Sequence, residues 1–265
     1  METTNAASIE AAHLTRRYGS FNAVDDLTLI VQPGEFFGFL GPNGAGKSTT
    51  IRMLCGQLPP TSGTVRVGGF DVTETSLDAK RIIGVVPEET VLYEALSASE
   101  FLTFAGQMHG FSLSEARCRT DELLALTGLE SARGRPIADY SMGMKKKTAL
   151  AAALLHGPRV LFLDEPFNGV DPVSVRALCN VLQTAAQKHG VTVFFTSHVL
   201  ETVERLCSRV AVLHQGKLAA IGTVPELRKQ ARRVSPSVPE NASLEAVYLS
   251  LIGAQNELKS LSWYA

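Results

Sequence analysis

Residues 36–49 read Phe36-Phe37-Gly38-Phe39-Leu40-Gly41-Pro42-Asn43-Gly44-Ala45-Gly46-Lys47-Ser48-Thr49. An apolar run of strand length leads into a glycine-rich turn, and the turn leads into a helical stretch that ends near Cys55. This is the pattern G-x-x-x-x-G-K-S of the P-loop, or Walker A motif. Its glycines let successive backbone N–H groups point into one concavity, and the following helix adds its positive N-terminal end. The stretch therefore predicts a phosphate-binding loop, with Lys47 reaching the β- and γ-phosphates and Ser48 ligating Mg²⁺.

The composition is that of an ordinary globular protein, with 265 residues, 45% hydrophobic and 19% charged, and a formal net charge of −1. This charge balance indicates no nucleic-acid partner. The four cysteines have no C-x-x-C spacing, so we expect reduced thiols and no zinc or disulfide framework. Met1–Ala12 lacks the pattern of a secretory leader, and the longest apolar runs are far below the roughly 18 residues of a membrane helix. If the chain works at a membrane, we expect another chain to supply the spans.

Runs of strand length alternate with helical stretches along most of the chain. The runs Ile82–Val86, Arg159–Pro166 and Val191–Thr196 are separated by long helical segments, as in the right-handed crossovers of a largely parallel sheet. Capping patterns that begin at Ser97 and Ser112 predict two further helices between the first two runs. The sequence therefore predicts an α/β fold with a helical insert.

Two stretches leave alternatives open. Tyr18 falls in a loop predicted between the β runs Ser8–Arg16 and Leu27–Val31. An exposed aromatic ring there would stack on a nucleotide base, or would instead pack on its own sheet. The Arg-rich piece Arg228–Arg233 is typical of a loop or of a solvated helix end.

Three predicted strands end in groups that suit phosphate chemistry, and the carboxyl ends of parallel strands form the usual ligand edge of such a sheet. One strand ends in the P-loop, one in Asp164-Glu165 and one in Ser197-His198. Asp164 would anchor Mg²⁺ together with Ser48, Glu165 would orient or activate a water, and His198 would hydrogen-bond near the γ-phosphate. Taken singly, Asp164-Glu165-Pro166 also fits a polar turn and His198 a surface histidine. Together with the P-loop they predict ATP hydrolysis.

These residues and their order resemble an ABC-type ATP-binding subunit over nearly the whole chain. The motifs follow in the family's order: Tyr18 as the base-stacking aromatic, Gly41–Thr49 as Walker A, Val85–Glu89 as the Q-loop, Tyr140–Met144 as the signature, Val160–Pro166 as Walker B, Asn168–Pro172 as the D-loop and Ser197-His198 as the H-loop. Many NTPases have a P-loop, whereas the signature position combined with the H-loop is specific to ABC proteins.

The resemblance implies a P-loop NTPase (RecA-like) core with a mostly parallel sheet, an N-terminal antiparallel β subdomain and an inserted helical subdomain. An ATP-binding domain would span residues 1–230, with the helical insert at about 88–158, and residues 231–265 would form a C-terminal extension.

The resemblance also implies the roles of single residues. ATP would contact Tyr18 and every residue of Gly41–Thr49, and Lys47, Glu165 and His198 would be catalytic. The metal ligands implied for Mg²⁺ are Ser48, Asp164 and Glu88.

A second nucleotide-binding subunit, identical or different, is implied as a head-to-tail partner. Ser141 and Gly143 would contact the ATP of that second subunit through the N-terminus of their helix, and Asp171 would couple the two sites across the interface. Integral membrane permease subunits would hold the pair at the cytoplasmic face of the membrane, where ATP-driven closure would move the substrate.

Two departures from the family pattern bear on function. The signature LSGGQ is replaced by Tyr140–Met144, with Met142 and Met144 in place of Gly and Gln. This form, and the C-terminal stretch Leu244–Leu249, resemble the type-2 exporter branch, so an exporter is expected. Glu88 stands at the Q-loop glutamine; a carboxylate ligates Mg²⁺ but cannot donate a hydrogen bond.

Two other functions fit the same motifs. One is an ABC ATPase without a transport role, although its repair type would need a long heptad insert and its translation type two cassettes in one chain. The other is a slow-turnover, nucleotide-gated regulatory module, for which Glu88 and the altered signature are the motivation.

Overall fold

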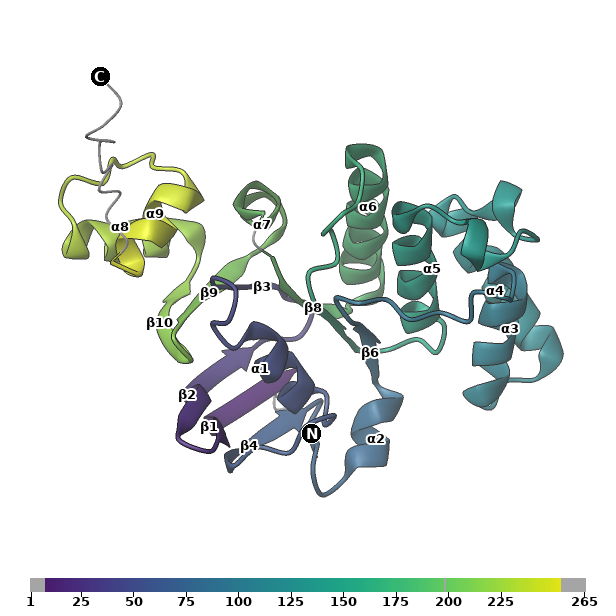
Figure 1. Ribbon diagram of the computed structural model, residues 1–265, viewed down its shortest axis with the longest axis horizontal. Coiled ribbons are helices and arrows are strands. Elements are labelled where there is room, and N and C mark those ends of the chain that lie inside the picture. Colours follow the sequence, from purple (N-terminus) through teal and green to yellow (C-terminus); the bar gives the residue numbers. More distant parts are fainter. Residues whose placement is uncertain (1–7, 198, 254–265) are drawn as a thin grey trace, which may run out of the picture.

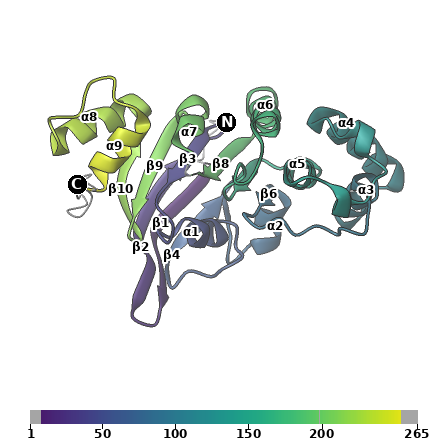
Figure 2. The same ribbon diagram turned by 45° about the horizontal axis from the view of Figure 1, so that its top comes forward.

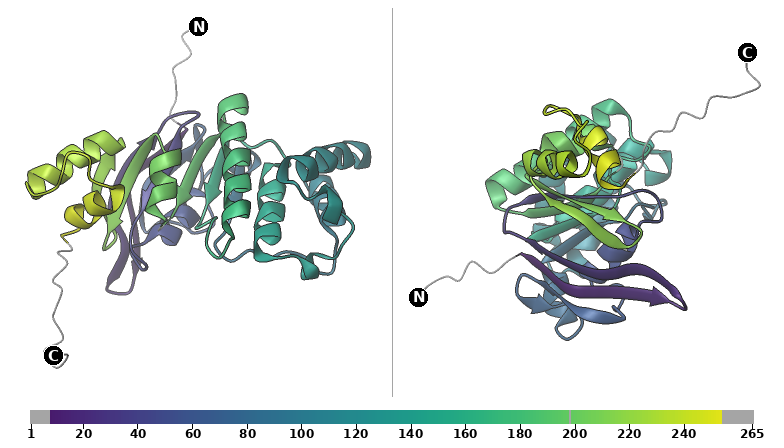
Figure 3. Two further views of the ribbon diagram at one scale, coloured as in Figure 1. Left: turned by 90° about the horizontal axis from the view of Figure 1, so that it is seen from above. Right: turned by 90° about the vertical axis from the view of Figure 1, so that its left-hand side faces the viewer.

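The structure is a computed structural model, and it describes residues 8–197 and 199–253 (Figure 1). His198, for which the sequence predicts a catalytic role, lies outside these residues. Two β-sheets occupy the middle of the molecule, a helical lobe lies at one end and the C-terminal helices lie at the other (Figure 3). No helix in the described ranges is both long and apolar enough to cross a membrane.

The central sheet has the strand order β10-β9-β3-β8-β7-β6. All its neighbouring strands are parallel except the hairpin β9–β10, so the predicted α/β fold with a mostly parallel sheet is confirmed. Its strands are β3 (Phe36–Leu40), β6 (Ile83–Val86), β7 (Val160–Leu163), β8 (Thr192–Thr196), β9 (Arg209–His214) and β10 (Lys217–Gly222).

Strand β3 lies inside this sheet, and its side chains alternate between two hydrophobic cores, as the two-residue period of a strand requires. Phe36 and Leu40 belong to the core on one face of the sheet. Phe37 and Phe39 belong to the core on the other face, where both rings pack on Phe194 of β8 with centroids 5.4 and 5.2 Å away. The strand that leads into the P-loop is therefore held from both sides.

The predicted N-terminal antiparallel subdomain is a four-stranded sheet of order β2-β1-β4-β5. Its strands are β1 (Ile9–Tyr18), β2 (Phe21–Val31), β4 (Ser62–Val67) and β5 (Phe70–Asp71). Helix α1 (Lys47–Leu54) buries Ile51 in the core that this sheet shares with β3. The loop position expected for Tyr18 is wrong, because Tyr18 ends β1 and pairs with Phe21. The β1–β2 turn therefore lies at the tip of a ribbon that projects beyond the rest of this sheet (Figure 2).

Helices cover the opposite face of the central sheet (Figure 1). They are α5 (Met142–Leu154), α6 (Pro172–His189), α7 (Leu200–Leu206), α8 (Val224–Val234) and α9 (Leu244–Leu251). Helix α2 (Ser76–Arg81) lies near β6 and buries Ala79 in the core that the N-terminal sheet shares with β3. The Arg-rich piece Arg228–Arg233 lies inside α8 and is not a loop, since Leu227 and Ala231 bury one face of this helix in the core. Helix α8 runs across position 230, so the boundary expected there stays a prediction.

The helical insert has a small core of its own. Ser97 and Glu100 form the predicted capping box at the start of α3 (Ala98–Met108), and Ser112 caps α4 (Leu113–Thr127). Two short 3₁₀ turns, Glu130–Ala132 and Ile137–Asp139, lead from α4 to α5.

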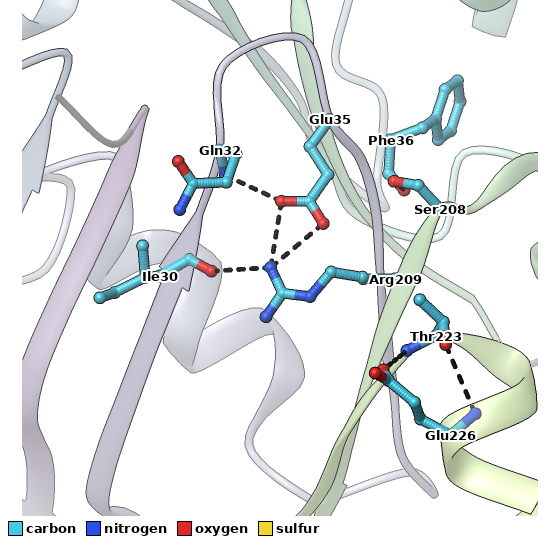
Figure 4. Close-up of polar contacts among 8 residues, drawn as sticks. All are labelled: Ile30, Gln32, Glu35, Phe36, Ser208, Arg209, Thr223 and Glu226. Atoms are coloured by element: carbon cyan, nitrogen blue, oxygen red, sulfur yellow. Dashed lines mark hydrogen bonds and ion pairs between the residues drawn. The ribbon is translucent and has the colours of Figure 1, made fainter. Parts of the chain in front are cut away.

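An ion pair ties the turn before β3 to the start of β9 (Figure 4). One Arg209 guanidinium nitrogen lies 3.2 Å from both carboxylate oxygens of Glu35 and donates to the Ile30 carbonyl at 3.3 Å. The Glu35 carboxylate also accepts the N–H of Gln32 at 2.8 Å. Because Glu35 is buried, these partners offset the cost of removing its charge from water, and they fix where β3 begins.

Candidate active site

The P-loop connects β3 to α1, and two of its glycines are required by close backbone contacts. Gly46 has φ +105°, and a Cβ atom on it would lie 2.3 Å from the Ala23 carbonyl oxygen. A Cβ atom on Gly41 would lie 2.6 Å from the Leu213 carbonyl oxygen. No other residue type fits at these contacts without moving the backbone.

Lys47 begins α1, and its side chain folds back over the loop. Its ammonium donates to the Gly41 carbonyl at 2.8 Å and lies 3.5 Å from Oε1 of Glu165. Both side chains are buried, so the pair brings opposite charges together in a region of low dielectric. The sequence predicted both residues as catalytic, and the structure brings them together.

Asp164 and Glu165 follow β7, and Thr196 at the end of β8 holds both of them. The Thr196 hydroxyl donates to Oδ1 of Asp164 at 2.7 Å and accepts the N–H of Glu165 at 2.9 Å. Glu165 has φ +45°, an unusual conformation for a residue with a side chain. Such strain persists only where neighbours impose it, and it is common at functional sites. Sequence reasoning missed Thr196, which ends an apolar run.

A cleft of about 850 Å³ lies over the P-loop. The predicted ATP contacts line it except for Ala45, which is buried. Asp164, predicted as a metal ligand, is also buried and lies outside this lining. Other elements complete the cleft, including Glu88 of the Q-loop, Asn168 of the D-loop and Ser197. Tyr248 of α9 also lines it, a contact that no local sequence pattern indicates. Within the described chain, Ser141, Gly143 and Asp171 lie outside this lining.

Tyr18 lines the cleft and is 49% exposed. The guanidinium of Arg16 lies 4.7 Å from the centre of its ring, a cation–π distance. Arg16 is itself anchored, since it donates to the Pro59 carbonyl at 2.8 Å. Arg16 thus supports the Tyr18 ring, which lines the cleft.

The Q-loop is joined to α5 by Lys146, which is 3% exposed. Its ammonium donates to the Glu88 carbonyl at 2.6 Å and lies 3.4 Å from the Pro87 carbonyl. Burial lowers the pKa of Lys146, and the carboxylates of Glu88, Asp164 and Glu165 oppose that shift. Sequence reasoning missed Lys146 too, although a charged residue one turn before the buried Leu150 on α5 was a usable signal.

The signature lies at the start of α5, where Ser141 and Met142 are exposed whereas Tyr140 and Gly143 are buried. The Ser141 hydroxyl accepts the N–H of Met144 at 3.3 Å and caps the helix. Gly143 is buried, and a Cβ atom on it would lie 2.6 Å from Oγ of Ser174 and 3.0 Å from Oδ2 of Asp171. Glycine here lets the first turns of α5 and α6 approach each other. Asp171 caps α6, and the N–H that it accepts from Ser174 lowers its pKa.

The comparisons with known proteins agree with this geometry. The sequence model of the ABC transporter family matches residues 24–168. The chain is 42% identical over 221 residues to the linearmycin resistance ATP-binding protein LnrL of Bacillus subtilis (strain 168), an alignment that covers 83% of this chain and 70% of LnrL. This chain belongs to the ABC transporter family.

Other relatives of this ABC protein are consistent with that assignment. It is 37% identical over 225 residues to the bacitracin transport ATP-binding protein BcrA of Bacillus licheniformis, which covers 85% of this chain and 72% of BcrA. A solved structure of an ATP-binding subunit of an ABC transporter superposes with a TM-score of 0.82 and 33% identity, over 92% of this chain and 98% of that one. The predicted family and the P-loop NTPase fold are thereby confirmed.

The donors around the P-loop of this ABC protein fit Mg²⁺, which prefers oxygen ligands. The cleft is lined by Ser48 and Glu88, and the Asp164 carboxylate is held in place at the end of β7. No group of three or more His, Cys, Asp or Glu side chains that could hold a metal ion occurs in residues 8–197 and 199–253.

Proposed function

We propose that this chain is the ATP-hydrolysing subunit of a membrane ABC exporter. The observation that carries the proposal is the contact of Lys47 and Glu165 at 3.5 Å beside the P-loop cleft. Lys47 at the end of the glycine-rich loop and Glu165 after β7 supply a cation that neutralises phosphate charge and a carboxylate that positions water, as γ-phosphate transfer to water requires.

In the proposed reaction, the backbone N–H groups of the P-loop and the start of α1 hold the phosphates. Lys47 exchanges the Gly41 carbonyl for phosphate oxygens and neutralises their charge. Glu165, released from Lys47, orients the attacking water and accepts its proton. Bound Mg²⁺ would neutralise charge on the phosphate oxygens, and Ser48, Asp164 and Glu88 are its proposed ligands. His198 is proposed as a further hydrogen-bond donor to the γ-phosphate.

The proposed base site uses the aromatic end of the cleft. The adenine ring would stack on the face of Tyr18 that Arg16 does not cover, since the Arg16 guanidinium lies 4.7 Å from the ring centre on the other face. The P-loop residues Gly41–Thr49 would then contact the phosphates from below.

The partners proposed for this chain are a second nucleotide-binding subunit and membrane permease subunits. In support, the first turn of α5 carries no acidic side chain, so the helix end at Ser141 offers positive potential to an anion outside its own cleft. Gly143 contributes by keeping that end fixed on α6, and Asp171 would lie at the interface between the two copies. The permease would place the subunit at the cytoplasmic face of a membrane.

Export is proposed because relatives at 42% and 37% identity are named for linearmycin resistance and bacitracin transport. Those cargoes belong to the relatives.

The test is ATP hydrolysis by Glu165→Gln in the purified chain and in the complex with its membrane partner. We expect ATP binding to persist, turnover to fall about a hundredfold or more because the general base is lost, and ATP-bound dimers to accumulate. Glu74→Gln, an exposed carboxylate remote from the cleft, is the matched control and should hydrolyse ATP normally. Chelation of Mg²⁺ should stop turnover in both. Undiminished hydrolysis by Glu165→Gln would remove Glu165 from the reaction, and recovery of no membrane protein with the tagged chain would count against export.

A further inference from the structure

Lys146 is a buried cation to which the reaction proposed above assigns no role. It lies on α5, the same helix whose exposed N-terminus carries Ser141. Its aliphatic part lies among apolar side chains and lines a small cavity with Val86, Leu150 and Leu163. A charged residue in such surroundings costs folding free energy unless hydrogen bonds or opposite charges compensate its charge.

The ammonium of Lys146 donates hydrogen bonds to the backbone of the Q-loop. It donates to the Glu88 carbonyl at 2.6 Å and lies 3.4 Å from the Pro87 carbonyl, directly after β6 ends. The Glu88 side chain itself remains exposed and lines the nucleotide cleft. Lys146 therefore binds the main chain of Glu88, whose side chain lines the nucleotide cleft.

The same end of the sheet is tied to Walker B. The Asp164 N–H donates to the Val86 carbonyl at 2.8 Å, so β6, β7 and the Q-loop form one unit beside the cleft. The carboxylates of Glu88, Asp164 and Glu165 all act on the Lys146 charge. Lys146 thus offsets negative charge beside the cleft, and it does so from the signature helix.

We propose that Lys146 is a positioning residue that links the Q-loop to the signature helix, so that movement of Glu88 at this chain's nucleotide is passed to the helix end at Ser141. The transmission of movement from Glu88 to Ser141 rests on the proposed function, whereas the physical link between the Q-loop and α5 does not. A neutral side chain at position 146 leaves the two carbonyls without their charged donor, and the Q-loop then moves independently of α5.

The first test measures the link without nucleotide. Full-length protein is digested with a glutamate-specific protease, and cleavage after Glu88 and Glu89 is compared with cleavage after Glu74, an exposed site in another loop of the same molecule. Lys146→Met fits the apolar surroundings and removes the donor. We expect cleavage at Glu88 and Glu89 to rise about tenfold, in line with the loss of a charge-assisted hydrogen bond, with Glu74 unchanged.

The matched control is Lys145→Met, the neighbouring lysine, which pairs with Glu94 and is not buried. It should leave the cleavage ratio unchanged. Equal acceleration at Glu74 and at the Q-loop would indicate general destabilisation and overturn the proposal, and so would an unchanged ratio. If Lys146→Met does not fold, Lys146→Gln is tested in its place. Its side chain is shorter and neutral, so cleavage at Glu88 and Glu89 relative to Glu74 should still rise severalfold.

The second test measures transmission. Lys146→Met should bind ATP within about twofold of the wild type but turn it over about tenfold more slowly, since binding through the P-loop is intact and only positioning is lost. Equal loss of affinity and rate, or no loss of rate, would overturn transmission. A wild-type chain that binds no ATP would contradict the proposed function, while the cleavage ratio would still decide the link.

Discussion

Thr196→Val hardly changes the volume of the side chain, but we expect it to lower both the stability of the protein and kcat. The substitution replaces a hydroxyl by a methyl group of similar volume at a fully buried position. It removes the bond to Oδ1 of Asp164 at 2.7 Å and the acceptor of the Glu165 N–H at 2.9 Å. Two polar groups at the catalytic edge of the sheet lose their partner at once.

The magnitude follows from these two bonds. A buried N–H left unsatisfied costs about 1–3 kcal/mol, and a hydrogen bond to a carboxylate contributes about 1.5–3 kcal/mol. Allowing for relaxation, we expect the free energy of unfolding to fall by about 3 kcal/mol. Glu165 is also strained at φ +45°. Without the Thr196 hydroxyl its backbone can relax toward an ordinary φ, which carries the carboxylate away from Lys47 and should lower kcat about tenfold or more.

Thr192→Val is the matched control, because Thr192 begins the same strand and is equally buried. Its hydroxyl accepts the Gly34 N–H at 2.9 Å, far from the cleft, so we expect a loss of about 1–2 kcal/mol in stability with kcat unchanged. Denaturant unfolding and single-turnover ATP hydrolysis are measured for both variants where both are folded, and Thr196→Ser should restore activity. If Thr196→Val keeps the kcat of the control, the role assigned to Thr196 is refuted.

Two further predictions concern the support of Tyr18 and the role of Glu88. Arg16→Met should weaken ATP binding about threefold to tenfold, with kcat nearly unchanged, because Tyr18 loses its cation–π support. Arg17→Met is the control in the same equilibrium-binding assay, because it removes an exposed hydrogen bond to Asn22. Glu88→Gln should raise the Mg²⁺ concentration needed for half-maximal turnover, because a carboxylate ligand becomes a neutral one; an unchanged Mg²⁺ titration would show that Glu88 has no special metal role.

Elements with strong local signals could be predicted from the sequence. The capping patterns at Ser97 and Ser112 depend on residues within one turn, and α3 and α4 begin where these patterns predict. The P-loop is as local, because its glycines and Lys47 are consecutive. Structure that depends only on neighbouring residues can therefore be predicted from the sequence alone.

The errors and omissions come from contacts between distant segments. The misplaced Tyr18 is an exception, because it pairs with Phe21 across the two-residue Gly19-Ser20 turn, a local hairpin signal that sequence reasoning missed. Thr196 binds groups 31 and 32 positions away, and Lys146 binds a carbonyl 58 positions away. Such partners are set by the sheet order, which alternation of strands and helices does not specify.

The signature helix allows a test of whether a second chain is needed. Ser141 caps α5 from an exposed position, and Ser112 caps α4 in the same way through the Glu115 N–H. Aspartate is as good a cap as serine, so Ser141→Asp and Ser112→Asp should both leave stability nearly unchanged. Only Ser141→Asp places a negative charge where the phosphate of a second copy is expected, and like charges there oppose closure. We therefore expect ATP to bind each chain normally while ATP-dependent dimers, followed by light scattering, disappear in Ser141→Asp alone. Dimers that persist in Ser141→Asp would mean that this helix end does not meet the second nucleotide.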